Sequence, residues 1–186
     1  MATNASPIAA HRNRVAILVA LATIVLVVVV IAGTLRAHSP FTPTGTMGTG
    51  HTEGTATRLL DGRVLVAGGG AGVTSPLLAS AELYDPKTGT FSATGSTFVA
   101  ENCTATLLSD GRVLFAGGDD GLASLSSAHL YDPSNGTFNS IGSMTTGREG
   151  HTATLLSDGR VLIAGGQSAG NTKSGTPFAS AELYQP

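Results

Sequence analysis

Histidine, cysteine and carboxylate side chains are the groups of this chain that can bind a metal ion. Three histidines lie in its repetitive part, at His51, His129 and His151. A metal site needs several ligands at characteristic spacings along the chain. The nearest acidic neighbours, Glu53 beside His51 and Glu149 beside His151, are only two residues away. The pattern therefore predicts no metal site.

Two further groups have the residue types of a site. Residues 119–121 read Asp-Asp-Gly, like a fragment of a calcium loop, but the further acidic positions of such a loop are missing. His151, Ser157 and Asp158 have the types of a hydrolytic triad, yet the same aspartate recurs in two earlier segments, where its side chain is expected to cap a turn. We assign no catalytic residue and no cofactor.

The recurring segments set the architecture. The aspartates Asp61, Asp110 and Asp158 are 49 and 48 residues apart, a period typical of solenoids, propellers or arrays. Each follows a Thr-Ala-Thr strand pattern and precedes Gly-Arg-Val-Leu and a Gly-Gly pair, which predicts a hairpin. A third strand ending in Tyr and a short fourth strand follow. Four antiparallel strands in ~50 residues make one propeller blade.

These units resemble the Kelch family of β-propellers. The shared features are the Gly-Gly pair, a Tyr-Asp-Pro after the third strand, and an aromatic six residues past that aspartate, at Phe91 and Phe138. The resemblance covers about 41–186. The usual Trp of the fourth strand is Phe here, and the third copy ends at Tyr184-Gln185-Pro186. The resemblance implies an all-β fold of about three Kelch-type repeats, at about 50–97, 98–144 and 145–186.

Residues 41–47 are expected to form an N-terminal strand. Their sequence, Phe-Thr-Pro-Thr-Gly-Thr-Met, matches residues 138–144, which form the fourth strand of the second unit. The strand either completes the blade that the C-terminal unit begins, or is the tail of a blade lost by truncation.

Residues 15–35 are 21 residues without a charge, dominated by Val, Leu, Ile and Ala. Such a helix reaches about 30 Å, the thickness of a bilayer core. Arg12 and Arg14 precede it and Arg36 follows, so we expect a single-pass anchor with a cytoplasmic tail at 1–14, a linker at 36–40 and extracytoplasmic repeats at 41–186. The alternative is a cleaved signal peptide.

Composition limits the partners. Residues 37–186 contain seven basic and 12 acidic residues, which gives a net charge near −5. This charge argues against a nucleic-acid partner. Cys103 is the only cysteine, so no intrachain disulfide is possible.

The expected role is binding rather than catalysis. Galactose-oxidase-like propellers are the enzymes closest in fold, so a degenerate oxidase or sugar-active enzyme is the alternative. Their copper site needs a unique tyrosine–cysteine pair, whereas Tyr84, Tyr131 and Tyr184 hold one equivalent position in each unit, as packing demands.

Recognition should lie in the loops that the repeats do not share, those between the second and third strands, together with the connections between blades. A protein or a glycan is the expected ligand. The candidate binding residues are Glu53, Glu101, Asn102, Asp119, Asp120, Arg148, Glu149, Asn171 and Lys173.

Three units are fewer than the ~4–8 blades of closed propellers. A homodimer that completes a six-bladed ring is therefore expected, and a fragment of a longer Kelch protein is the alternative.

Overall fold

The computed structural model describes residues 40–70, 77–96, 98, 100–168 and 175–186. The chain divides into two units, Met1–Pro43 and Thr44–Pro186, and all the strands lie in the second. The predicted membrane helix at 15–35 lies outside the described residues. Within the described ranges, no helix has the length and apolar character needed to cross a membrane.

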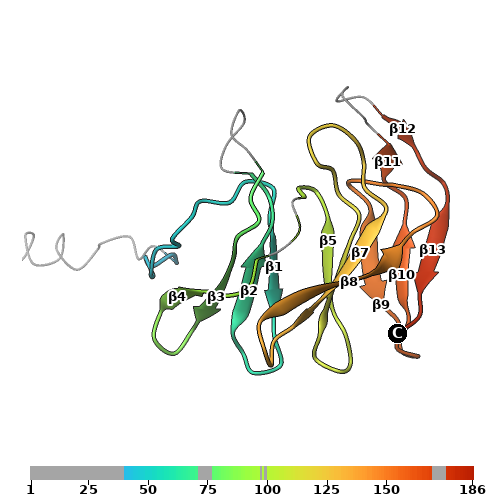
Figure 1. Cartoon of the computed structure of the whole chain (residues 1–186). Coiled ribbons are helices and arrows are strands. Elements are labelled where there is room, and N and C mark those ends of the chain that lie inside the picture. The colour runs from blue at the N-terminus through green and yellow to red at the C-terminus, as the bar shows by residue number, and fades with distance from the viewer. Residues whose placement is uncertain (1–39, 71–76, 97, 99, 169–174) are drawn as a thin grey trace, which may run out of the picture. The chain divides into compact units, whose positions relative to one another are not determined.

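Two four-stranded antiparallel sheets form where the first two repeats were predicted (Figure 1). Blade 1 contains β1 (Thr55–Arg58), β2 (Val64–Ala67), β3 (Ala81–Asp85) and β4 (Thr90–Ala93). Blade 2 contains β5 (Thr104–Leu107), β6 (Val113–Ala116), β7 (Ser127–Asp132) and β8 (Thr137–Ser143). In each, the strands pair in chain order, which confirms the predicted blades.

Blade 3 has three strands in the described part of the chain. They are β9 (Thr152–Leu155), β10 (Val161–Ala164) and β13 (Ala181–Tyr184), in the order β13-β10-β9. The loop between β10 and β13 carries a small ribbon of β11 (Gln167–Ser168) and β12 (Thr176–Pro177). The outer edge of β13 therefore has no strand beside it among the described residues.

The strand expected at 41–47 is not formed, since no residue of this segment is in a strand. From Thr44 onward the chain instead follows blade 1. The Thr44 hydroxyl lies 2.8 Å from the Tyr84 hydroxyl, and the Gly45 N–H donates to the Gly89 carbonyl at 2.8 Å. The segment thus contacts blade 1 and not the edge of β13.

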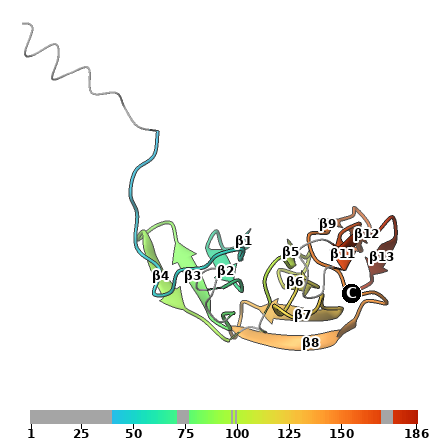
Figure 2. The ribbon, with the colours of Figure 1, turned by 90° about the horizontal axis from the view of Figure 1, so that it is seen from above.

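The three blades share one register and pack side by side, with β5 between β1 and β9 (Figure 2). In blade 1, Leu65 of β2 pairs with Leu83 of β3, and Leu162 pairs with Leu183 in blade 3. The Leu65 side of blade 1 packs against Val113, Phe115 and Tyr131 of blade 2 in one apolar cluster. A second cluster joins blade 2 to blade 3 in the same way. Burial of these apolar side chains is the main force holding neighbouring blades together.

The β1–β2, β5–β6 and β9–β10 turns are built alike. In each, the aspartate carboxylate accepts the backbone N–H two residues later, at 3.0 Å for Asp61 and Arg63. The equivalent distances in the other two turns are 3.0 and 3.1 Å. Gly62 has φ of 91°, a conformation that glycine adopts without a Cβ clash. The predicted capping role of these aspartates is confirmed.

The repeated tyrosines pack against the repeated phenylalanines. Ring centroids are 4.8 Å apart for Tyr84 and Phe91, and 4.7 Å apart for Tyr131 and Phe138. The interplanar angles, 44° and 46°, are also alike. These two tyrosines therefore have the packing role expected from their equivalent positions.

Candidate functional site

The antiparallel order of the strands separates two ends of the blades (Figure 1). We call one end the turn face; it carries the β1–β2 and β3–β4 turns and their counterparts. We call the other end the loop face; it carries the β2–β3 and β6–β7 loops, the β10–β13 loop and the connections between blades. The predicted binding residues that the structure describes lie in these loops and connections.

The turn face repeats one arrangement and satisfies its own charges. An arginine follows each turn aspartate by two residues and forms an ion pair with it. The Nη2–Oδ2 distances are 2.8 Å for Arg63 and Asp61, 2.6 Å for Arg112 and Asp110, and 2.7 Å for Arg160 and Asp158. Identical and internally paired turns offer little to distinguish one ligand from another.

The loop face brings together acidic residues from different repeats. Glu101 pairs with Asp119 through an antiparallel bridge, and Glu149 with Gln167 through the equivalent one. The Asn102 amide nitrogen lies 3.3 Å from Glu53 Oε2 and 3.3 Å from Asp119 Oδ2. This amide therefore joins carboxylates from two blades.

Asn102 and Glu53 have positive φ angles, which residues other than glycine seldom adopt. Their φ values are 54° and 57°, and Gly150 at the equivalent place has 60°. Asparagine tolerates the left-handed region better than most residues, whereas it is uncommon for glutamate. The connections are further tied by Asn102 N–H donating to the Glu53 carbonyl at 3.3 Å and Gly150 N–H to the Asn102 carbonyl at 3.4 Å. These hydrogen bonds fix the backbone of the connections that carry the acidic side chains of the loop face.

Four carboxylates, which we call the acidic cluster, influence one another here: Glu53, Glu101, Asp119 and Glu149. Partial burial, with the negative charges of Asp119, Glu53 and Glu149, raises the pKa of Glu101. Partial burial and a hydrogen bond with Asp119 raise the pKa of Glu149, although the Gln167 amide donates to it at 3.2 Å. Like charges held close together make the ionised state costly.

No cation offsets this charge within the described ranges. The ion pairs found there are the three turn pairs and Arg148 with Glu182, and His51 Nε2 lies 3.8 Å from Glu82 Oε1. Nor does any group of His, Cys, Asp and Glu side chains in that part of the chain have the arrangement to hold a metal ion. Among the described residues, the cluster is therefore a surface of uncompensated negative charge, suited to basic groups of a partner.

The β6–β7 loop adds an exposed tip to the loop face. Asp120 Oδ1 accepts the N–H groups of Leu122 and Ala123 at 3.0 and 2.8 Å, and these bonds lower the pKa of Asp120. Leu122 is 69% exposed at the tip. Asp120 therefore shapes its own loop and presents an apolar side chain.

Arg148 was predicted to be a binding residue, and this prediction is wrong. Its side chain is fully buried and donates to the Gly165 carbonyl at 2.8 Å and to Glu182 Oε1 at 2.9 Å. It also bonds Ser180, and its guanidinium carbon lies 5.4 Å from the centre of the Phe178 ring. Arg148 thus links parts of blade 3 to one another inside the protein. Its side chain is not accessible to a ligand.

Sequence reasoning missed this internal polar network. Glu82 in blade 1 accepts the N–H groups of Gly48 and Thr49 at 2.9 and 3.0 Å. Glu182 accepts those of Thr145 and Thr146 at 2.7 and 3.3 Å. The glutamate in the repeated Ser-Ala-Glu-Leu-Tyr was the available signal, since a charged residue at a core-facing strand position needs partners.

Blade 2 replaces that glutamate by His129. The His129 ring stacks on Phe98, with centroids 4.1 Å apart and an interplanar angle of 8°. Burial lowers the pKa of His129, which favours the neutral ring that stacks there.

The two other histidines and the cysteine of this region have structural roles. His51 Nδ1 lies 2.7 Å from the Gly68 carbonyl oxygen, and His151 Nε2 lies 2.9 Å from the Thr104 hydroxyl. Burial raises the pKa of Cys103 to about 11. Asn171 and Lys173, the last two predicted binding residues, lie outside the described residues.

The fold is thus a set of propeller-type blades with a uniform turn face and a varied, acidic loop face. The profile of the Kelch motif matches the chain twice, over residues 53–96 and 102–145. These two segments are thus Kelch repeats, and the chain resembles the Kelch-repeat β-propeller family. A search of curated proteins finds no match to it.

Proposed function

We propose that this Kelch-repeat chain is a non-catalytic interaction module that binds a protein through its loop face. The observation that carries the proposal is the difference between the two ends of the blades. Turn-face aspartates are paired with arginines of the same turn, whereas the acidic cluster has no cation beside it in the described structure. Variable loops on a regular scaffold are the usual place for recognition.

The charge of the loop face favours a partner segment with lysine or arginine side chains. Burial and the neighbouring carboxylates raise the pKa values of Glu101 and Glu149, and a cation placed beside them would relieve the repulsion between the carboxylates. A neutral glycan would gain nothing from this relief. Electrostatic complementarity of this kind raises the association rate and selects among partners.

The membrane anchor belongs to the same proposal. Residues 15–35 hold the chain in a bilayer with the N-terminus in the cytoplasm and the repeats outside. The Gly45–Gly89 bond brings the chain into blade 1 beside the β3–β4 turn, on the turn face. Residues 36–44, which join the helix to this bond, span at most about 32 Å, so we expect the turn face to lie toward the membrane and the loop face toward partners.

The test compares proteins that co-purify with three versions of the tagged full-length chain. The loop-face variant is Glu101→Gln with Asp119→Asn and Glu149→Gln. The matched control, Asp110→Asn with Asp158→Asn, removes charge from the turn face and keeps side chains able to cap a turn.

Quantitative mass spectrometry should show a protein that is retained by the wild type and the control and lost from the loop-face variant. Equal retention by both variants would reject the loop face as the binding surface. Preferential loss from the turn-face control would move the site to the opposite end.

A further inference from the structure

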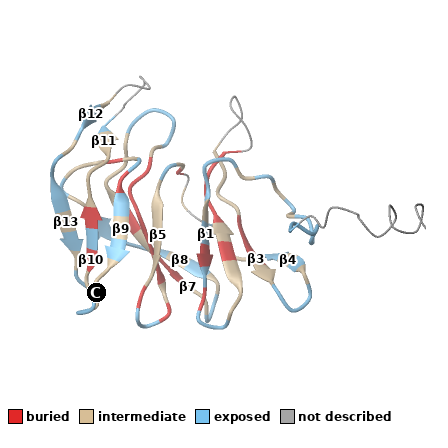
Figure 3. Cartoon of the chain, turned by 180° about the vertical axis from the view of Figure 1, so that it is seen from behind, coloured by how far each residue is buried: buried red, intermediate tan, exposed pale blue. Residues whose placement is uncertain are grey.

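The inter-blade interface is left open at blade 3. In blade 1 the paired leucines Leu65 and Leu83 are 1% and 7% exposed, because blade 2 covers them. The equivalent pair in blade 3, Leu162 and Leu183, is 37% and 42% exposed. Figure 3 shows β13 as an exposed strand at one end of the row of blades. An apolar sheet face built for a neighbouring blade thus has none in the described chain.

The opposite end of the row carries the complementary face. Blades 2 and 3 receive the preceding blade on Val113 and Phe115, and on Val161 and Ile163, all of them buried. Blade 1 has valines at the equivalent positions, and they are only half-buried. One chain therefore presents both halves of its own repeated interface, at opposite ends.

Residues 44–49 lie on blade 1 as the tail of a preceding blade would. Thr94 bonds the Tyr131 hydroxyl at 2.9 Å where the chain passes from blade 1 to blade 2, and Thr44 bonds Tyr84 at 2.8 Å in the same way. Glu82 accepts N–H groups at 48 and 49 as Glu182 accepts those at 145 and 146. On blade 1, residues 44–49 thus make the contacts that the residues after a fourth strand make with the next blade.

The sequence before Thr44 suits a fourth strand. Phe41 precedes Gly45 by four residues, as Phe91 precedes Gly95 and Phe138 precedes Gly142. Phe91 and Phe138 each pack on the tyrosine of their own blade. In blade 3, no fourth strand lies beside β13 among the described residues.

We infer that a second copy of this chain docks head to tail, so that residues 41–44 form the fourth strand of blade 3 in the partner subunit. By the register of β3 and β4, Phe41 pairs with Tyr184 of the partner subunit and Pro43 with Glu182 of the partner subunit. Two copies of three blades then make a six-bladed ring, within the ~4–8 blades of closed propellers.

The proline at position 43 agrees with this register. Thr94 N–H donates to the Ala81 carbonyl, and N–H groups alternate in direction along a strand, so the Ala93 N–H points away from β3. Pro43 is the counterpart of Ala93, at a place where the missing N–H costs no ladder bond.

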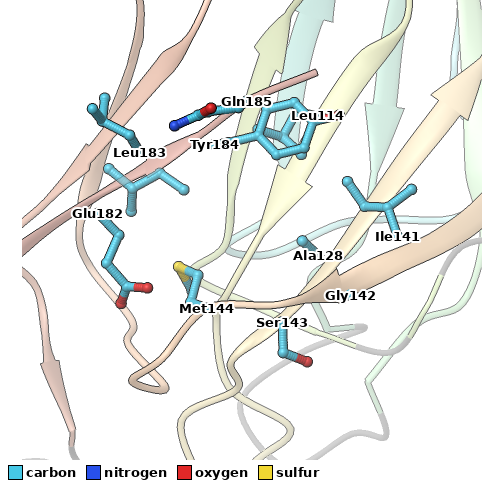
Figure 4. Close-up of a pocket in the computed structure, with 11 residues that line it drawn as sticks. Leu114, Ala128, Ile141, Gly142, Ser143, Met144, Glu182, Leu183, Tyr184 and Gln185 are labelled. Carbon is cyan, nitrogen blue, oxygen red and sulfur yellow. The ribbon is translucent and has the colours of Figure 1, made fainter.

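A groove lies beside the edge that the strand would cover (Figure 4). Its volume is about 220 Å³, and Ile141, Leu183 and Tyr184 are among its lining residues. Ile141 stands where Thr44 and Thr94 stand in the other blades, so no threonine is available there for the Tyr184 hydroxyl. The aromatic ring of Phe41 from the partner subunit is the group that packs on Tyr184.

The test is a cysteine cross-link in the full chain carrying Cys103→Ser. Positions 41 and 184 correspond to a non-hydrogen-bonded pair, in which Cβ atoms are close enough for a disulfide. Phe41→Cys with Tyr184→Cys should give a covalent dimer on non-reducing gels. The matched control, Phe41→Cys with Leu183→Cys, should not, because residue 183 faces the other side of the sheet.

Co-expression of the two single variants, Phe41→Cys and Tyr184→Cys, should also give the dimer. A disulfide in a species of monomer mass would mean closure within one chain and would overturn the inference. So would equal cross-linking by the control pair.

A second measurement does not depend on Phe41. Leu183→Asp should convert the detergent-solubilised full chain from dimer to monomer in sedimentation while cooperative unfolding is retained, because this leucine is exposed in one copy. A wild-type monomer, or a variant that stays dimeric, would contradict the inferred interface.

Discussion

The guanidinium of Arg148 and the carboxylate of Glu182 lie 2.9 Å apart, and the pair joins the connection after blade 2 to strand β13. The arginine side chain is fully buried, and the glutamate side chain is 21% exposed. Burial alone would raise the pKa of Glu182, but bonds from Thr145, Arg148 and Thr146 hold it below its ordinary value. The carboxylate therefore stays ionised beside the arginine.

Removing the arginine should destabilise blade 3 strongly. Arg148→Ala leaves Glu182 without its cation and the Gly165 carbonyl without its donor. Breaking a buried pair from one side costs about 3–5 kcal/mol. Urea unfolding followed by circular dichroism measures the loss. A change below about 1 kcal/mol would contradict the role assigned to the pair.

Glu101 should reduce stability at neutral pH. Its raised pKa means that the folded chain binds the proton more tightly than the unfolded chain, so stability is lost as pH rises from about 4.5 through the raised value. Glu101→Gln should therefore raise the melting temperature at pH 7 and leave it unchanged at pH 4.

Asp110→Asn is a control in which the effect on stability should depend on pH in the opposite direction, because hydrogen bonding and ion pairing with Arg112 lower the pKa of Asp110. This variant should lose stability at pH 7 and recover relative to the wild type as pH falls below about 3.8. Thermal melts of the wild type and both variants between pH 3 and 7 test whether the two substitutions change the melting temperature in opposite directions at pH 7. Equal slopes for the two variants would show that neither group titrates as described.

Cys103 should resist alkylation. Its thiol has a pKa of about 11 because of burial, and only the thiolate is nucleophilic. Maleimide at pH 7 should modify the folded protein at least about 100-fold more slowly than the urea-unfolded chain, given the ordinary thiol pKa of about 8.5. An introduced Ser109→Cys, on the exposed β5–β6 turn, serves as the reactive control. Equal rates at the two positions would refute the buried thiol.

The orientation of the anchored chain is open to lysine labelling. Lys87 lies in the β3–β4 turn, and Lys173, the only other lysine, lies in the β10–β13 loop. If the turn face lies toward the bilayer, an impermeant biotin reagent on intact cells should label Lys173 more than Lys87. The protein should also stay in the membrane after alkaline washing. A mature N-terminus at Gly33 would replace the anchor by a cleaved signal.

Much of the fold follows from local patterns in the sequence. The Asp-Gly reversals, the alternating strands and the repeated tyrosines each specify a structure through neighbouring residues, and all three appear as expected. The two ends of the blades also follow from strand order, which is why Glu101, Asn102 and Asp119 were placed on one face.

The failures arise where long-range packing decides. Arg148 has the same local context as an exposed connection residue, and only the position of Glu182 some 34 residues later shows that it turns inward. The segment 41–47 has the sequence of a fourth strand, but a strand needs an edge to pair with. Blade 1 offers Thr44 a tyrosine hydroxyl rather than a free strand edge.

Recognition by the loop face can be tested by site-specific photo-cross-linking. A benzophenone amino acid replaces Leu122 at the loop tip, or Ser134 at the exposed β7–β8 turn, in the full-length chain in its native membranes. If the loop face binds the partner, position 122 should give a discrete protein adduct that disappears when Glu101→Gln and Glu149→Gln are added, and position 134 should give none. An adduct from position 134 alone, or one from position 122 that persists without the two carboxylates, would contradict recognition by the loop face.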